Sequence, residues 1–214
     1  MSQSMSDIFP LALTPLHDFK SKLEGLFLSF AGKSMPGDFP LIGVRCEPMP
    51  ADQEGLFHAK KAQLGVRISD DTPRPCLTAL HEIGHAIDWF GFGSHGYQSQ
   101  AVAKKTVQSD VWQNWLNALE TTIHVQRLRH LQANPSELEN LPSPKLLVLY
   151  RLLPQELFAR CFAQYFSQKS QNPYALQDLL TTQRETIVPW HWENDEFGTI
   201  LIPKLDAIFG EQRW

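Results

Sequence analysis

The stretch LTALHEIGHAIDWF, residues 77–90, decides how this chain of 214 residues is organised. His81 and His85 lie four positions apart, so an α-helix with 3.6 residues per turn places both side chains on one face. Glu82 is turned by about 100° from His81 around the helix axis, and its carboxylate therefore occupies a neighbouring position. The apolar residues in and around the motif provide a face that can be buried: Leu77, Leu80, Ile83 and Ile87. The pattern predicts a packed helix that presents two imidazoles to one point.

The flanking residues predict where this helix begins and ends. In SDDTPRP, residues 69–75, Asp71 or Thr72 can act as the N-cap, and prolines are tolerated in the first turn. The glycines of GFGSHG, residues 91–96, break the helical pattern. We therefore expect the helix to end at about Phe90.

Alternating patterns upstream predict a small sheet. Apolar side chains alternate with smaller or polar ones over residues 64–69, which is typical of a strand with one buried face. This strand can be the second arm of a hairpin that begins at Leu56, and a further strand-like run covers residues 41–46. Helical spacing recurs in PQELFARCFAQYFSQKS, residues 154–170. Four other segments show it as well: residues 16–32, 110–132, 174–185 and 196–209. We expect an α+β fold that is mainly helical, with a single domain over residues 1–214.

The composition is that of an ordinary globular protein. Hydrophobic residues make up 43% of the chain and charged residues 20%, and the formal net charge is −4. A mildly acidic chain offers no basic surface, so we expect neither a nucleic-acid partner nor a membrane partner. No apolar run reaches the roughly 20 residues that span a bilayer, and the N-terminus lacks the features of a signal peptide. Cys46, Cys76 and Cys161 are odd in number and far apart, which favours a reducing compartment and predicts a cytoplasmic protein.

The spacing of His81, Glu82 and His85 matches the H-E-x-x-H pattern, in which two histidines bind zinc and the glutamate acts as a general base. A catalytic zinc takes three protein ligands and keeps one position for water, so a third ligand has to lie elsewhere. The extended pattern with a third histidine fails, because Asp88 and Gly91 occupy its glycine and histidine positions. The alternative is that both histidines are ordinary, partly buried residues of a helix.

Glu156 is the best candidate for the third ligand. It lies at the start of the helix expected over residues 154–170, and Ala159 and Ala163 follow it on the same stripe. Small side chains on that stripe let another helix approach closely. A carboxylate in such a contact is costly to bury unless it meets a cation. The alternative is an exposed glutamate that the dipole of the helix N-terminus favours.

Two further charged residues lie at positions from which they can support the ligands. Asp88 follows His85 by three residues on the same face, and it can accept a hydrogen bond from a ligand imidazole or pair with Arg160. Arg160 lies one turn beyond Glu156 on the second helix. A carboxylate on the helix surface is an equally good interpretation of Asp88.

The two blocks LHEIGHAIDW and PQELFARCFAQYF together resemble gluzincin-like zinc metallopeptidases, and in particular the compact metallopeptidase-like domains of phage and mobile-element proteins of bacteria. The resemblance implies that His81, His85 and Glu156 hold one catalytic Zn²⁺ ion and that Glu82 is the base. It also implies a zincin-like fold, in which a small twisted sheet packs on the H-E-x-x-H helix and on a second, glutamate-bearing helix. The strand over residues 64–69, or its hairpin partner, would pair with a peptide or protein substrate bound as an extended strand.

The function that this resemblance implies is zinc-dependent peptide hydrolysis. Zinc lowers the pKa of its bound water toward about 7, and Glu82 accepts the proton as the water attacks a peptide carbonyl. A second donor stabilises the oxyanion, for which the sequence offers four candidates: Tyr97, Tyr150, Tyr165 and His191. Two other functions stay open, namely a catalytically inactive zinc-binding protein with a structural or partner-binding role in a mobile element, and an effector protease injected by a secretion system. Glu82 favours an enzyme, because an inactive descendant has no reason to keep the base.

Overall fold

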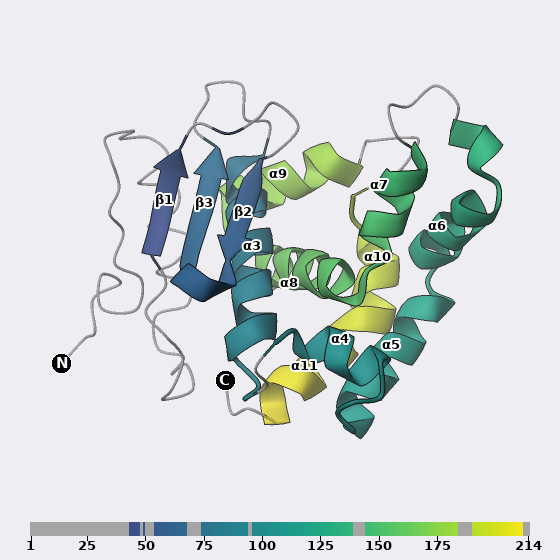
Figure 1. Ribbon diagram of the computed structural model, residues 1–214. Helices are drawn as coiled ribbons and strands as arrows, with labels where there is room; N and C mark the ends of the chain where they lie inside the picture. The colour runs from purple at the N-terminus through teal and green to yellow at the C-terminus, as the bar shows by residue number, and fades with distance from the viewer. Residues whose placement is uncertain are drawn as a thin grey trace.

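The described part of the chain is mainly helical, with a three-stranded sheet on one side of the molecule (Figure 1). This confirms the expected α+β class with a helical majority. The helix expected over residues 16–32 and the two proposed N-cap residues, Asp71 and Thr72, lie outside the described residues. The computed structural model describes residues 43–47, 49, 54–67, 74–93, 96–138, 144–183 and 190–211.

The sheet consists of β1 (Gly43–Glu47), β2 (Gly55–His58) and β3 (Gln63–Arg67). The central strand is β3, which runs parallel to β1 and antiparallel to β2. The expected hairpin is therefore confirmed, and a 3₁₀ turn at Ala59–Lys61 joins its arms. Among the described strands β3 has a partner on both sides, so of the two hairpin strands it is β2 that lies at an edge of the sheet.

Helix α3 (Pro75–Phe90) carries the histidine pair and packs against both the sheet and helix α8 (Pro154–Ser170). The end of α3 and both ends of α8 lie where the sequence predicts them. The N-cap residue of α3 is Arg74, which makes no capping hydrogen bond through its side chain. Instead, two backbone N–H groups of the first turn donate to Asp178 Oδ2 at 2.9 and 3.2 Å. Asp178 belongs to α9 (Pro173–Gln183), so a tertiary contact caps α3.

The two site-bearing helices approach each other closely at Gly84 and Ala159. A Cβ atom added at Gly84 would lie 2.8 Å from Ala159 Cα, a separation that real side chains do not adopt. Ala159 and Ala163 are fully buried, in agreement with the stripe of small residues in the sequence. Glu156 lies near this contact and is only 5% exposed, which excludes the alternative of an exposed glutamate.

The remaining helices surround α8 on the side away from the sheet (Figure 1). None of the described helices is long and apolar enough to cross a membrane. Their bounds are α4 (Gln98–Ala103), α5 (Asp110–Thr121), α6 (Ile123–Ala133), a 3₁₀ turn (Pro135–Leu138), α7 (Pro144–Arg151), α10 (Asn194–Glu196), a π-helical turn (Phe197–Leu201) and α11 (Ile202–Glu211).

The single helix expected over residues 110–132 is wrong, because the chain forms two helices that meet at Thr122. The backbone of Thr122 is extended, with ψ 141°, and its hydroxyl accepts a hydrogen bond from the Val125 N–H of the second helix. The buried indole of Trp192 also donates to this hydroxyl, at 3.1 Å. Thr122 thus ends one helix and caps the next, and a residue far along the chain holds it there.

Candidate metal centre

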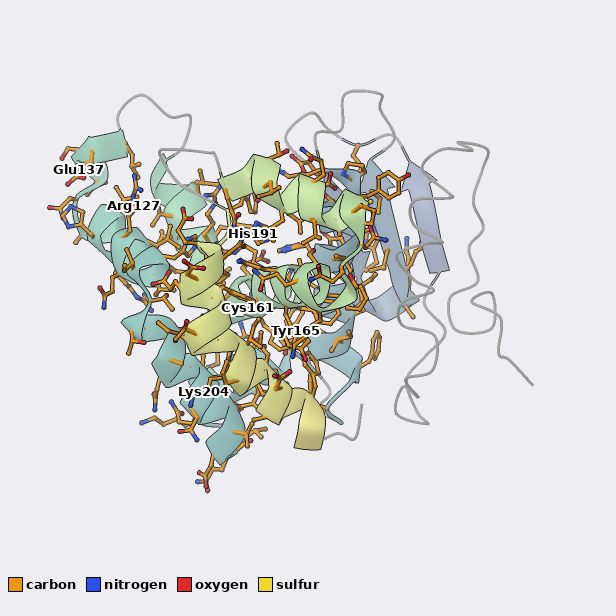
Figure 2. The ribbon with its side chains drawn as sticks, turned by 180° about the vertical axis from the view of Figure 1, so that it is seen from behind. Arg127, Glu137, Cys161, Tyr165, His191 and Lys204 are labelled. Atoms are coloured by element: carbon orange, nitrogen blue, oxygen red, sulfur yellow. The ribbon has the colours of Figure 1, made fainter. Side chains whose placement is uncertain are left out.

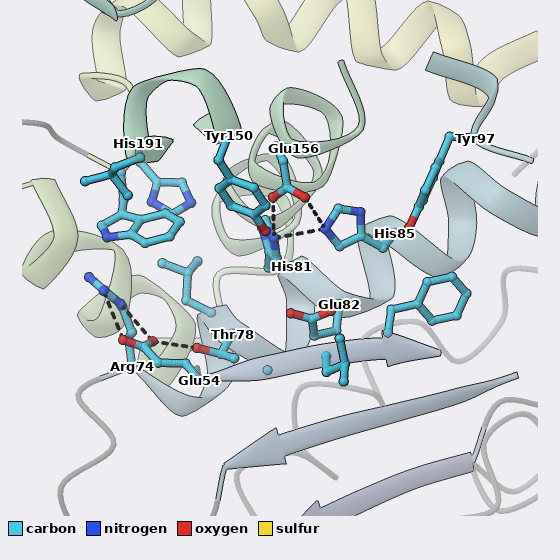
Figure 3. Close-up of a pocket in the computed structure, with 16 residues that line it drawn as sticks. Glu54, Arg74, Thr78, His81, Glu82, His85, Tyr97, Tyr150, Glu156 and His191 are labelled. Carbon is cyan, nitrogen blue, oxygen red and sulfur yellow. Dashed lines mark hydrogen bonds and ion pairs between the residues drawn. The ribbon is translucent and has the colours of Figure 1, made fainter. Parts of the chain in front are cut away.

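His81, His85 and Glu156 converge on one point between α3 and α8 (Figure 3). The Nε2 atoms of the two histidines lie 3.1 Å apart. Glu156 places one carboxylate oxygen 3.3 Å from His81 Nε2 and the other 3.3 Å from His85 Nε2. His85 and Glu156 are buried, and His81 is half-buried. The sequence predicts this trio, and the three side chains together can hold a metal ion.

The electrostatic balance of the trio depends on burial and on the opposite charges that the groups can carry. Burial raises the pKa of Glu156, but the imidazoles of His81 and His85 outweigh it and hold the pKa well below its ordinary value. Burial lowers the pKa of His85, but Glu156 and then Glu82 raise it by more. One oxygen of Glu156, Oε2, is nevertheless buried without a hydrogen-bond partner. A cation shared by the trio would satisfy this oxygen.

Glu82 lies on the opposite side of the two imidazoles from Glu156, next to β2 (Figure 3). It is buried, and this burial raises its pKa above the ordinary value, while the two imidazoles and a hydrogen bond from the Phe57 backbone N–H lower it. The strand leaves room for the carboxylate at Gly55, where an added Cβ atom would lie 2.7 Å from Glu82 Oε1. The side chain is therefore fixed beside the trio without belonging to it.

The chain matches no protein-family model, no curated protein and no solved structure. Any functional assignment therefore depends on the geometry of the site. A substrate can reach the three candidate ligand atoms and the neighbouring carboxylate only through open space beside them.

A cavity of about 530 Å³ opens beside the trio. Residues of β2 and the first half of α3 form one wall, and α7, the start of α8 and residues 190–191 form the other. At one end, Arg74 forms a two-pronged ion pair with Glu54, with both nitrogen–oxygen distances at 3.1 Å. The guanidinium groups of Arg74 and Arg151 also lie over the Trp190 ring, 5.0 and 4.1 Å from its centroid. This end of the cavity is thus held by aromatic and ionic contacts.

Two of the four candidate oxyanion donors are tyrosines that line this cavity. Burial, and then the nearby Glu156 carboxylate, raise the pKa of Tyr150 well above its ordinary value. The Tyr97 ring packs edge-on against His85, with 5.7 Å between the ring centroids. Burial raises the pKa of Tyr97 to about 12. Both hydroxyls therefore keep their protons at neutral pH.

The other two candidates differ from each other in position. Tyr165, which is labelled in Figure 2, is not among the residues that line the cavity, and its hydroxyl donates to Asp206 on α11 at 2.6 Å. Nine residues separate Tyr165 from Glu156 on α8, which corresponds to about 2.5 helical turns, so the two side chains lie on opposite faces of the helix. His191 lines the cavity, and its ring is buried.

Asp88 and Arg160 are both fully buried but make neither of the contacts expected of them. Asp88 accepts hydrogen bonds from the Ser99 backbone N–H at 2.8 Å and from the Ser99 hydroxyl at 2.5 Å, at the start of α4. The Nδ1 atom of His85 has no hydrogen-bond partner, so Asp88 does not orient this ligand. It is not a surface carboxylate either, because its position three residues after His85 places it over the α4 N-terminus.

Arg160 donates to backbone oxygens rather than to a carboxylate. Its partners are the carbonyl groups of Glu156, Trp190 and Arg151, and it also contacts His124 Nε2 at 3.3 Å. A single buried guanidinium thus connects α8 with the end of α7, with the cavity wall and with α6. Sequence reasoning identified Arg160 as a supporting residue but assigned it the wrong partner.

Sequence reasoning did not identify Gly55, the first residue of β2, or Glu54, which precedes it, although both line the cavity. Glu54 accepts a hydrogen bond from the Thr78 hydroxyl at 3.1 Å, one turn before Glu82 on α3. A glycine at the start of a strand signals a close approach by another group. That signal was present in the sequence, whereas nothing marked Glu54 as the partner of Thr78.

Proposed function

We propose that this protein is a zinc-dependent peptidase with a zincin-like arrangement of its sheet and site helices. One observation carries the proposal: a buried carboxylate, Glu82, lies beside three converging ligand side chains in the wall of a cavity. Structural zinc sites are closed by four protein ligands, whereas catalytic sites have three and keep a position for water. Among the described residues the converging group has three members, which favours the catalytic kind of site.

Zinc is the metal that best suits this group. Two imidazole nitrogens and a carboxylate oxygen are a common ligand set for catalytic zinc. In a tetrahedral site with bonds of about 2.0–2.1 Å, neighbouring ligand atoms lie about 3.3–3.4 Å apart. The two Nε2 atoms lie 3.1 Å apart and each lies 3.3 Å from a different oxygen of Glu156, which is close to that value. When bound, zinc supplies Lewis-acid chemistry, because it lowers the pKa of a water molecule toward about 7 and polarises a carbonyl group.

Glu82 is the proton acceptor in this proposal. Because burial raises its pKa, the carboxylate takes up a proton more readily than an exposed glutamate does. The Phe57 N–H and the space at Gly55 hold it on the cavity side of the imidazoles. Tyr150 is the proposed oxyanion donor, since its protonated hydroxyl lies next to Glu156 at the cavity wall.

The proposed substrate is a peptide bound as an extended strand along β2. Within the part of the chain that the structure describes, this strand pairs with β3 alone, and residues 54–57 line the cavity. Backbone hydrogen bonds to such an edge give affinity with little dependence on sequence. The 64–69 strand is not an option for this pairing, because it forms the centre of the sheet.

Metal analysis and a hydrolysis assay test the proposal together. The wild type should contain about one zinc ion per chain, and His85→Ala and Glu156→Ala should each lose most of it. Glu82→Gln should keep its zinc, while hydrolysis of an unfolded protein substrate falls by about 10²- to 10⁴-fold. Full zinc in Glu156→Ala would overturn the third ligand, and unchanged hydrolysis in Glu82→Gln would overturn the mechanism. A wild type that binds zinc but hydrolyses nothing would instead be the inactive zinc-binding protein.

A further inference from the structure

His191 has an unused hydrogen-bonding atom in the wall of the cavity. The residue is 5% exposed, and its Nε2 atom is buried without a hydrogen-bond partner. Figure 3 shows the imidazole on the cavity side of its backbone. A buried polar atom without a partner is unfavourable unless a ligand or a water completes it. The kind of partner it requires depends on where the ring carries its proton.

The hydroxyl of Thr182 decides the position of that proton. It donates to the Leu179 carbonyl oxygen at 2.8 Å, as hydroxyls in helices commonly do. It also lies 3.1 Å from His191 Nδ1. Its only hydrogen is engaged with Leu179, so the hydroxyl oxygen accepts from the ring, and Nδ1 carries the proton. The opposite tautomer would lose one of the two hydrogen bonds and leave a buried N–H without an acceptor.

The ring is also neutral. Burial lowers the pKa of His191 well below its ordinary value, and the nearby charges of Arg160 and Arg74 add to this effect. A neutral ring protonated at Nδ1 offers a lone pair at Nε2, which accepts a hydrogen bond and cannot donate one. His191 is therefore unsuited to the role of oxyanion donor for which the sequence made it a candidate.

We propose that His191 Nε2 is a hydrogen-bond acceptor that selects peptide substrates with a neutral donor group, the carboxamide of glutamine or asparagine, at this end of the cavity. The substrate part of this proposal rests on the peptidase function. A carboxylate has no hydrogen to donate, and an apolar side chain leaves Nε2 unpaired. An ammonium or guanidinium group is disfavoured by the charge of Arg160, which donates to backbone oxygens and not to a carboxylate. The Trp190 ring and Leu147 line the same cavity and can contact the apolar stem of a carboxamide side chain.

Histidine ¹⁵N NMR tests the tautomer without any activity. The wild type should give the His191 signals of a neutral ring protonated at Nδ1, assigned by their loss in His191→Gln. Thr182→Val should shift the ring toward the other tautomer, whereas Thr182→Ser keeps the hydroxyl and should preserve the wild-type signals. A wild-type ring protonated at Nε2, or charged at pH 7, would overturn the proposal.

A binding measurement identifies the donor. In zinc-loaded Glu82→Gln, which should not cleave what it binds, a glutamine-containing hexapeptide should shift the His191 Nε2 resonance. The same peptide with methionine in place of glutamine should leave that resonance unchanged. Equal shifts with both peptides would overturn the proposed selection.

Hydrolysis of the same two peptides gives the functional test. The wild type should prefer the glutamine peptide by at least about tenfold in kcat/KM, because a site built around a hydrogen bond rejects the analogue that lacks it. His191→Phe should bring the ratio close to one, and Thr182→Ser should retain the preference. An unchanged ratio in a folded, zinc-loaded His191→Phe would overturn the role of His191. A wild type that cleaves neither peptide would contradict the peptidase function, and the NMR measurements would then decide the proposal on His191.

Discussion

The position of the Glu82 carboxylate depends on the absence of a side chain at Gly55. A Cβ atom there would lie 2.7 Å from Glu82 Oε1 and 2.8 Å from Thr78 Cγ2. Thr78 is tied to Glu54, so the carboxylate is the group that has to move in Gly55→Ala. Since a small displacement of the proposed base would be costly, we expect kcat to fall by about 10- to 100-fold with the zinc content unchanged. Steady-state kinetics and metal analysis of the same preparation check this.

Gly198→Ala is the matched control, because nothing lies within 4 Å of the added Cβ atom. This variant should keep both the zinc content and kcat. A Gly55→Ala protein with wild-type kcat would contradict the proposed placement of Glu82. Loss of zinc in Gly55→Ala would show that Gly55 supports the ligands and not the base alone.

Asp88 makes the stability of the protein depend on pH. Burial raises its pKa from 3.8 to about 7, although two hydrogen bonds from Ser99 oppose the shift. The folded state therefore holds this proton after the unfolded state has released it, so the contribution of Asp88 is greatest below pH 4 and is lost as pH rises to 7. Asp88→Asn can keep both contacts with Ser99 and does not titrate. As the pH rises from 4 to 7, the free energy of unfolding of Asp88→Asn should increase relative to that of the wild type, by at most about 4 kcal/mol. Denaturant titrations across this range measure the difference, and a constant difference would contradict it.

At the scale of single residues, the sequence predicts the positions of side chains that local helical spacing brings together. His81, Glu82 and His85 follow from the helical repeat, and Glu156 follows from the small residues on its stripe. The partner of Asp88 does not follow, because Ser99 comes into reach only through the turn between α3 and α4. The sequence leaves such long-range hydrogen bonds open.

At the scale of elements, local patterns give the helices and strands, but their ends depend on distant partners. Helix α8 has the predicted bounds because Pro154 marks its start in the sequence itself. The first turn of α3 is capped by Asp178 of α9, and the break at Thr122 is held by Trp192. In both places the deciding group lies far along the chain, so the sequence around the helix end carries no signal for it.

The contact between α3 and α8 should be sensitive to one added methyl group. In an exposed helix, Gly84→Ala would be stabilising by about 0.5–1 kcal/mol because alanine has the higher helix propensity. Here the added Cβ atom would lie 2.8 Å from Ala159 Cα and 3.1 Å from the Ala159 carbonyl oxygen, and backbone atoms cannot rotate away. We expect a loss of about 1–3 kcal/mol in the free energy of unfolding, and weaker zinc binding because Glu156 moves away from the histidines.

Chemical denaturation and competition with a zinc chelator measure these two effects of Gly84→Ala. Gly210→Ala in α11 is the control, because its added Cβ atom has open space. It should be neutral or slightly stabilising and should leave zinc affinity unchanged. Stabilisation by Gly84→Ala would mean that the two helices are further apart than described here.

At the scale of the whole molecule, the site joins two layers of the fold. Helix α3 rests on the sheet, and α8 lies in the helical layer, where Arg160 connects it to the backbone at Arg151 and Trp190. Burial lowers the pKa of Arg160 only to about 10, so this connecting group keeps its charge at neutral pH. A metal ion held by His81, His85 and Glu156 would bind across the boundary between these layers, and its effect should extend to the unfolding of the entire chain.

Removal of the proposed zinc ion should therefore lower the thermal stability of the protein. An ion that binds only the folded state contributes about 2.7 kcal/mol when its free concentration is 100 times the dissociation constant. For a chain of this size, each kcal/mol corresponds to roughly 2–4 °C, so a chelator should lower Tm by about 5–10 °C. Calorimetry with and without added zinc measures the shift.

Two variants separate binding by the trio from nonspecific effects of zinc on Tm. Glu82→Gln keeps all three ligands, so its Tm should respond to zinc as the wild type does. His85→Ala removes one ligand from α3 while Glu156 on α8 stays in place, so most of the zinc-dependent shift should disappear. An equal shift in His85→Ala and the wild type would place the stabilising ion elsewhere. A shift that disappears in Glu82→Gln as well would mean that this carboxylate helps to hold the metal and is not free to act as the base.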